Sequence, residues 1–255
     1  MSFEGLLSEE VFGFLLVFAR LGSGIMLLPG FGEVYVAPRI RLFLAFAITI
    51  AVTPVVTGIL PSMPEGTFEM AAVVVGEVII GLFLGASVRL LASALHIAGM
   101  FISIQSALAA GQFFDPNQGQ AGSLPGIFLS MFGILLIFVT GLHQPMLWAL
   151  RDSYTVFPPG LALPTEDFAQ LAVDIISGAF LIAFQIAAPI MVTSMLFYVS
   201  IGLIARLIPQ IQVFFIGLPI QIALALFVLM TVLGVVMMWY LEYFEAGLVP
   251  FMSTE

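Results

Sequence analysis

Arg20 and Glu77 are ionisable residues that lie inside long apolar segments of the sequence. A charged side chain in such a segment is costly unless it is paired, so both residues are candidates for function. One interpretation makes Glu77 a proton carrier or a substrate ligand. The other pairs it with Arg20, or with a polar group of another subunit, to fix helix packing. We favour pairing, because nothing else in the sequence resembles a proton relay.

The other reactive residue types form no catalytic or metal-binding motif. The sequence has two histidines, no cysteine and no lysine. His96 and His143 belong to no HExxH motif, and no carboxylates cluster near them. Without lysine, a phosphate-binding loop and a polybasic nucleic-acid patch are excluded. The aspartates fall in connectors or at segment ends: Asp115, Asp152, Asp167 and Asp174. We therefore expect no enzymatic activity, no cofactor, no metal and no nucleic-acid partner.

Phe113 and Phe114 lie in a loop-like stretch, residues 112–123, that contains several Gly and Gln residues and a proline. Two large aromatic side chains are poorly placed in a polar loop that is open to water. They either anchor the loop to a nearby core or occlude an aqueous path, since apolar constrictions can close a channel by dewetting. Composition does not decide between these two interpretations.

The elements that position these residues are predicted to be membrane helices. The chain is 62% hydrophobic and 8% charged, whereas a soluble domain has about 25% charged residues. This difference excludes a soluble enzyme, and the net charge of −9 argues against anionic partners. Six segments are apolar and long enough to cross a bilayer. They are residues 11–28, 38–60, 68–88, 124–150, 175–205 and 211–241.

The last two apolar segments predict an antiparallel hairpin. As helices each would extend about 46 Å at 1.5 Å per residue, which exceeds a hydrocarbon core of about 30 Å. Pro189 and Pro219 interrupt them, and residues 206–210 form a short connector. Such helices must tilt, kink or project from the membrane.

Residues 90–123 combine small and polar side chains that lipid would solvate poorly. We interpret them as a helix and a loop held inside protein, separate from a segment that ends at Arg89. Six crossings then place Arg39, Arg41, Arg89 and Arg206 together on the cytoplasmic side, with Arg151 as the exception. The start of the chain contains three glutamates and no basic residue, unlike a signal peptide, so we expect the first apolar segment to be retained.

Gly81 and Gly85 form a GxxxG pattern in the third apolar segment. Glycines at this spacing allow two helix backbones to approach closely. The pattern predicts close helix packing without specifying whether the partner helix belongs to the same chain.

Several short motifs occur in an order and spacing that resemble one known family. They are Pro29-Gly30-Phe31-Gly32, Pro38-Arg39-Ile40-Arg41, Gly111 with Asp115-Pro116, and Gly141-Leu142-His143 before Asp152-Ser153. The strongest is the run over residues 202–219, with Gln212 where the family usually has Asn. Over essentially the whole chain, the sequence resembles the FliR/SctT family of type III secretion export-gate proteins.

The resemblance implies a core subunit of the flagellar type III protein export gate, which is required for flagellum assembly. The fold would be all-α, a membrane-associated helical-hairpin protein with long kinked helices. FliP and FliQ would assemble with it into a helical channel for unfolded flagellar proteins, with FlhB at the cytoplasmic entrance. The resemblance also implies the bacterial inner membrane, the flagellar basal body and contact with lipid.

Three alternatives remain at this point. One is the export gate of a virulence-type injectisome, which the same family includes. The others are an ion-coupled small-solute transporter and a passive membrane scaffold. A transporter would be expected to show two similar halves, and the six segments show no such symmetry. A scaffold would have no need for a loop tipped with aromatic residues.

The resemblance also implies roles for particular segments. Residues 1–165 correspond to a FliP-like helical part and residues 166–255 to a FliQ-like helical hairpin. The pore-plugging loop of the family falls on residues 106–122, which favours occlusion over anchoring for its two aromatic residues. The implied plug residues are Gln112, Phe113, Phe114, Asp115 and Pro116. The implied hairpin-turn and assembly residues are Arg206, Pro209, Gln210 and Pro219.

Overall fold

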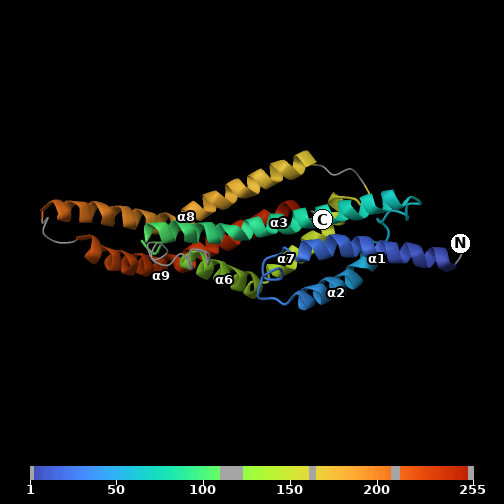
Figure 1. Cartoon of the computed structure of the whole chain (residues 1–255), viewed down its shortest axis with the longest axis horizontal. Coiled ribbons are helices and arrows are strands. Elements are labelled where there is room, and N and C mark those ends of the chain that lie inside the picture. The colour runs from blue at the N-terminus through green and yellow to red at the C-terminus, as the bar shows by residue number, and fades with distance from the viewer. Residues whose placement is uncertain (1–2, 110–122, 161–164, 208–212, 252–255) are drawn as a thin grey trace. The chain divides into compact units, whose positions relative to one another are not determined.

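The computed structural model describes residues 3–109, 123–160, 165–207 and 213–251, and the regular structure in these ranges is helical throughout. The predicted all-α fold is therefore confirmed. The elements in chain order are α1 (Phe3–Ile25), α2 (Pro38–Val56), α3 (Thr67–Gln105), α6 (Leu124–Val139), α7 (His143–Val156), α8 (Thr165–Leu207), α9 (Val213–Leu248) and a short 3-10 helix, η1 (Val249–Phe251) (Figure 1).

The two long C-terminal helices are present as predicted. α8 has 43 residues and α9 has 36, so they extend about 64 and 54 Å at 1.5 Å per residue. Pro189 and Pro219 lie inside them, where each proline removes a main-chain donor. α8 carries Glu166 and Asp167 in its first turn and Arg206 in its last turn. This order of charges matches the helix dipole.

α3 differs from the sequence prediction at Arg89. The prediction placed a helix end there, but α3 runs unbroken from Thr67 to Gln105 and contains no proline. The Arg89 side chain is 45% exposed and lies 3.9 Å from the Glu33 carboxylate. A charged residue on the exposed side of a helix leaves the backbone hydrogen bonds intact, so the predicted break is wrong.

The segment predicted at residues 124–150 is divided in two. α6 ends at Val139 and α7 begins at His143, with a sharp bend between them. Gly141 lies in the break with a φ of 81°, a conformation that residues with a Cβ adopt poorly. Pro145 falls in the first turn of α7, where proline is tolerated. The predicted segment is therefore two helices with a bend at Gly141, and not one straight helix.

Fewer helices qualify as membrane spans than the six predicted. Among the described residues, α2, α3, α8 and α9 are long and apolar enough, and α6 with α7 adds a fifth if the bent pair counts as one span. α1 is not among them, and it carries Glu9, Glu10 and Arg20. The multi-span membrane character predicted from the composition is retained.

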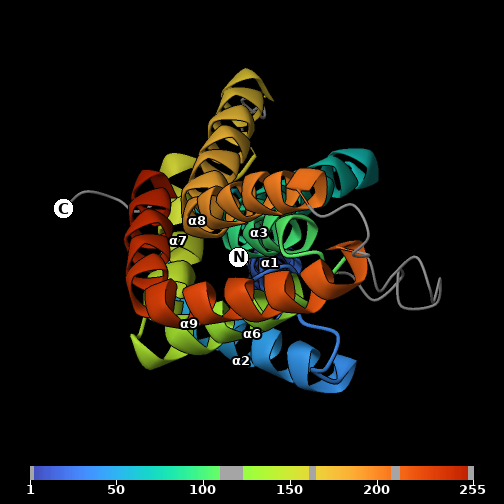
Figure 2. The ribbon, with the colours of Figure 1, turned by 90° about the vertical axis from the view of Figure 1, so that its left-hand side faces the viewer.

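The chain divides into two compact units. The first comprises Met1–Leu91, Phe138–Ile175 and Glu245–Glu255, and the second comprises Ala92–Ile137 and Ile176–Phe244. In the first unit, α1 and α2 lie side by side (Figure 1). In the second unit, α3 lies between α8 and α9 (Figures 1 and 2). α3, α6, α8 and α9 each contribute residues to both units.

Glycines bring α1 and α3 into direct backbone contact in the first unit. A Cβ at Gly81 would collide with the main-chain carbonyl of Arg20 and the hydroxyl of Ser23. A Cβ at Gly85 would lie 2.5 Å from the carbonyl oxygen of Gly24. The close packing predicted from the GxxxG pattern is therefore confirmed, and its partner helix belongs to the same chain.

Gly81→Ala is expected to lower the free energy of unfolding by about 1–3 kcal/mol, because the added methyl group overpacks the contact between α1 and α3. Gly76→Ala is the matched control, since it lies on the same helix with nothing within 4 Å of the added Cβ. Alanine forms helix better than glycine by about 1 kcal/mol, so this variant should keep or raise stability. Thermal unfolding of both variants in detergent measures the difference, and equal midpoints would contradict the packing.

Candidate functional site

Arg20 of α1 is fully buried in the first unit, and its guanidinium faces Glu77 of α3. Its Nε donates to Oε2 of Glu77 over 2.6 Å, and its Nη2 donates to Oε1 over 3.0 Å. This bidentate arrangement is the geometry in which a planar guanidinium best matches a carboxylate. Glu77 is 1% exposed. The pairing favoured by the sequence interpretation is present in the structure.

The end of α7 supplies the rest of the surroundings of Arg20. Its Nη1 donates to the main-chain oxygen of Ser153 over 3.1 Å and to the hydroxyl of the same residue over 3.3 Å. Its Nη2 also donates to the main-chain oxygen of Phe157 over 2.9 Å. The Tyr154 ring centroid lies 4.1 Å from Cζ, within range of a cation–π contact. The C-terminal end of a helix favours a cation, so one side chain joins α1, α3 and α7.

The chemistry of this cluster is that of a fixed support. Both carboxylate oxygens of Glu77 accept hydrogen bonds from Arg20, and arginine is not deprotonated in proteins. A buried ion pair is stable only where further hydrogen bonds satisfy the charges, and α7 provides them. The geometry therefore favours a packing role over the role of proton carrier or substrate ligand.

The residues on either side of positions 110–122 are held by hydrogen bonds within the second unit. α3 ends at Gln105, whose main-chain carbonyl accepts a hydrogen bond of 2.6 Å from the side-chain amide of Gln221 in α9. Ala107 then turns the chain with a φ of 61°. At the far end, the main-chain N–H of Gly126 donates to the hydroxyl of Ser123 over 3.0 Å and caps α6. The predicted plug residues lie outside the described residues: Gln112, Phe113, Phe114, Asp115 and Pro116.

The hairpin residues are partly described. Arg206 is exposed in the last turn of α8, and Pro219 is exposed inside α9. A Cβ at Gly217 in α9 would lie 2.6 Å from Cδ1 of Ile201 in α8. The two helices therefore approach each other closely near the turn. Two predicted residues lie outside the described residues: Pro209 and Gln210.

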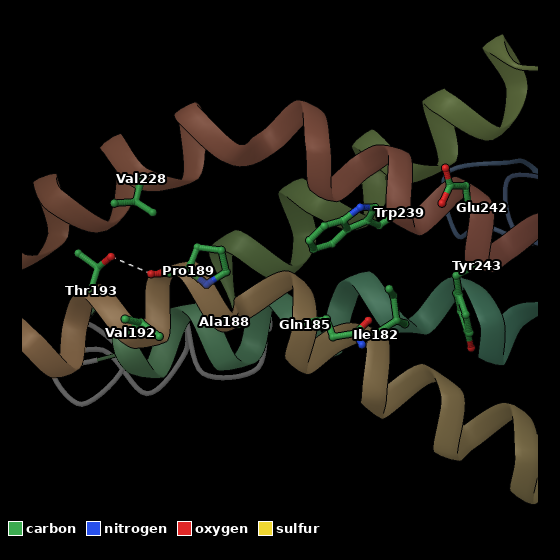
Figure 3. Close-up of a pocket in the computed structure, with 10 residues that line it drawn as sticks. All are labelled: Ile182, Gln185, Ala188, Pro189, Val192, Thr193, Val228, Trp239, Glu242 and Tyr243. Carbon is green, nitrogen blue, oxygen red and sulfur yellow. Dashed lines mark hydrogen bonds between the residues drawn. The ribbon is translucent and has the colours of Figure 1, made fainter.

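A groove of 1080 Å³ opens between α8 and α9 in the second unit (Figure 3). Pro189 lies in its wall, and the hydroxyl of Thr193 donates to the Pro189 carbonyl over 2.7 Å. Trp239, Glu242 and Tyr243 stand together at one end (Figure 3). The groove was not predicted, because hydrophobic periodicity does not show where two helices separate.

The histidines are placed in structural surroundings. His143 stacks on Phe138, with ring centroids 5.0 Å apart, and His96 lies beside Gly126 where α3 meets α6. Within the described ranges, no group of three or more His, Asp and Glu residues could hold a metal ion. The expectation that the protein uses no metal and no cofactor stays a prediction.

Comparison with known protein families places the chain. The sequence model of a family described as bacterial export proteins, family 1, matches residues 11–247. The chain belongs to this family. The family identified from the sequence motifs is thereby confirmed, and the members of this export family match nearly the whole chain rather than one segment of it.

Relatives in both flagellar and virulence systems are similar to the chain. The flagellar biosynthetic protein FliR of Caulobacter vibrioides is 35% identical over 237 residues, which cover 92% of this chain and 94% of the relative. FliR of Bacillus subtilis is 30% identical and covers 88% and 86%. The Yop proteins translocation protein T of Yersinia pestis is 28% identical and covers 65% and 64%.

Several residues of the sites were not predicted from the sequence. A buried arginine requires acceptors for its donors, but the main-chain carbonyls of Ser153 and Phe157 carry no signal in the sequence. Tyr154 and Gln221 look like ordinary helix residues, because their contacts are formed by segments that are distant in the chain. The position of Arg20 inside an apolar segment indicates that such partners exist, but it does not identify them.

Glu77→Gln is expected to destabilise the protein by about 3–5 kcal/mol, because it leaves the buried Arg20 without its counter-charge. Glu33→Gln is the matched control: its partner Arg89 is 3.9 Å away and 45% exposed, and such surface pairs contribute about 0–1 kcal/mol. Thermal unfolding in detergent measures both variants. A Glu77→Gln midpoint equal to that of Glu33→Gln would show that the pair does not support the fold.

Proposed function

We propose that this chain is a core subunit of the flagellar type III protein export gate. With FliP and FliQ it forms the channel through which unfolded flagellar proteins are secreted, and FlhB docks at the cytoplasmic entrance. The observation that carries the proposal is the match to proteins named flagellar biosynthetic protein FliR along 92% and 88% of this chain. The protein resides in the bacterial inner membrane at the flagellar basal body and performs no catalysis.

The lengths and surfaces of the helices support a subunit of an assembly. α8 extends about 64 Å, roughly twice the hydrocarbon core of about 30 Å. Large apolar side chains are exposed on α8 and α9, among them Met195 (71%), Leu207 (79%), Phe227 (69%) and Met230 (75%). Lipid can cover part of this surface. The part that extends beyond the hydrocarbon core needs protein neighbours, because a large apolar surface is unfavourable in contact with water.

The chain is proposed to combine a FliP-like part, residues 1–165, with a FliQ-like helical hairpin, residues 166–255. α8 begins at Thr165, and Pro158 and Pro159 lie in the connector that precedes it. The two compact units do not follow this boundary, because they group residues by contact and each draws on both parts. The proposed division instead rests on the resemblance of the two stretches of sequence to FliP and FliQ.

The loop at residues 106–122 is proposed to plug the channel, with Gln112, Phe113, Phe114, Asp115 and Pro116 as the gating residues. Its anchored ends support this role, because Gln221 holds the end of α3 and Ser123 caps α6. A plug must be fixed at its base while its tip remains free to be displaced. The aromatic pair would exclude water and ions from a narrow path.

The hairpin turn is proposed to be an assembly site, formed by Arg206, Pro209, Gln210 and Pro219. Arg206 is exposed at the end of α8 and makes no intramolecular ion pair with a carboxylate within the described ranges. An exposed arginine at a helix end can bind a carboxylate of a neighbouring subunit. FlhB, at the cytoplasmic entrance, is the proposed neighbour.

Two other functions have weaker support. The injectisome alternative draws on the Yersinia relative, which is similar over a smaller share of this chain than the flagellar relatives. A small-solute transporter would use Arg20 and Glu77 as binding groups. Both are buried and engaged with each other, so they are poorly placed to receive a solute.

Purification of the tagged full chain from its native membrane tests the proposal. FliP and FliQ are expected to co-purify with it, and Arg206→Ala is expected to reduce recovery of FlhB while leaving membrane insertion unchanged. Arg151→Ala is the control, since Arg151 already pairs with the adjacent Asp152 over 2.6 Å. Recovery of a homogeneous monomer that transports a small solute would overturn the export-gate function.

Deletion of residues 112–120 is expected to make membranes that contain the assembled gate leak ions, because the occluding side chains are removed. Phe113→Ala with Phe114→Ala should reproduce the leak. Gln118→Ala with Gln120→Ala is the control in the same loop and should remain tight. Membrane conductance measures all three, and unchanged conductance in the deletion would return the two phenylalanines to an anchoring role.

A further inference from the structure

Gln221 connects two elements that the proposed function treats separately. It lies in α9, is 3% exposed, and donates its side-chain amide to the main-chain carbonyl of Gln105 over 2.6 Å. Gln105 is the last residue of α3. The final carbonyls of a helix have no partner within the helix, and a buried polar group without a partner is costly. Gln221 therefore satisfies the end of α3 from a different helix.

The end of α3 depends on such support because its own turn is strained. Ala107 has a φ of 61°, a left-handed conformation that is unfavourable for a residue with a Cβ. Ser103 and Ser106 are buried beside it, and the Ser106 hydroxyl donates to the Ser103 carbonyl over 3.3 Å. The main-chain N–H of Ala109 donates to the same carbonyl over 3.1 Å. The turn is held by several bonds, and Gln221 ties it to α9.

Gln221 also occupies a sensitive position in the hairpin. Pro219 precedes it by two residues inside α9 and removes a main-chain hydrogen bond there. Gly217, two residues before Pro219, brings α9 against Ile201 of α8. Gln221 therefore lies within about one helical turn of both the proline and the contact with α8.

We propose that Gln221 is a positioning residue through which the α8–α9 hairpin fixes the C-terminal end of α3. This inference rests on the proposed function, because the ion tightness of the export gate is one of its readouts. When the bond is made, the base of the segment that follows α3 is held in one place. When the bond is lost, the end of α3 occupies several positions and the assembled gate conducts ions.

The test uses the full chain in the assembled, membrane-bound gate. Gln221→Met removes the donor while it keeps the length and the helix propensity of the side chain. Gln105→Met is the matched control, because the acceptor at that residue is the main-chain carbonyl, which the substitution retains. The chain has no cysteine, so spin labels at Ile104→Cys and Ile220→Cys report the separation of α3 and α9 without background labelling of this chain.

Gln221→Met is expected to broaden the distance distribution between the labels. It should also raise ion conductance about tenfold, the equivalent of about 1.4 kcal/mol, while recovery of the complex is unchanged. Gln105→Met should match the wild type in both readouts. If Gln221→Met does not assemble, Gln221→Asn, which keeps the amide but shortens its reach, should give a smaller change in the same direction.

The outcomes separate this inference from the proposed function. A wild-type distance distribution in Gln221→Met, or an equal broadening in Gln105→Met, overturns the positioning role, whatever the deletion of residues 112–120 does. A broadened distribution with a tight gate in both Gln221→Met and the deletion supports the positioning role and overturns the plug. Broadening together with leakage supports both.

Discussion

The buried charge of Arg20 is the constraint on which the first unit depends. A guanidinium that water cannot reach must find its hydrogen-bond acceptors in the protein, and here they come from Glu77 on α3 and from main-chain oxygens at the end of α7. These acceptors fix the register of three helices at once. The glycine contact depends on the same arrangement, because Gly81 packs directly against the main-chain carbonyl of Arg20. A shift of α3 along α1 would break both contacts together.

Whether a feature could be predicted from the sequence depends on how far apart along the chain its interacting residues lie. The helices, the hairpin and the close packing at Gly81 depend on composition and spacing along one segment, so they could be predicted. The pairing of Arg20 with Glu77 could be proposed because two opposite charges in apolar segments need each other. The break at Gly141 was missed because a single glycine in an apolar run does not by itself show that the residue adopts a positive φ. The predicted break at Arg89 was wrong because the charge lies on an exposed side of α3.

The partners of Gln221 and Arg20 show why the rest of the site could not be predicted. Both side chains bind main-chain carbonyls, and every residue has one, so residue type gives no signal. Which carbonyl is free depends on where a helix ends. The ends of α3 and α7 are set by Ala107 and by the capping interaction of Phe157, neither of which is a strong helix stop in sequence terms. Helix ends are therefore where sequence prediction was weakest and where the contacts of Arg20 and Gln221 are made.

The same contacts explain how an export channel can be built from a chain with so few charges. A passage for unfolded proteins needs a rigid wall and a part that can be displaced, and it needs no reactive group of its own. Arg20 joins α1, α3 and α7 through a single ion pair whose donors are all satisfied. The end of α3 is supported differently, by one neutral hydrogen bond from Gln221 beside a strained turn. Losing a neutral hydrogen bond costs less free energy than removing one partner of a buried bidentate ion pair. The end of α3 is therefore held less strongly than α1, α3 and α7 are held at Arg20, as the proposed displacement of the segment after α3 requires.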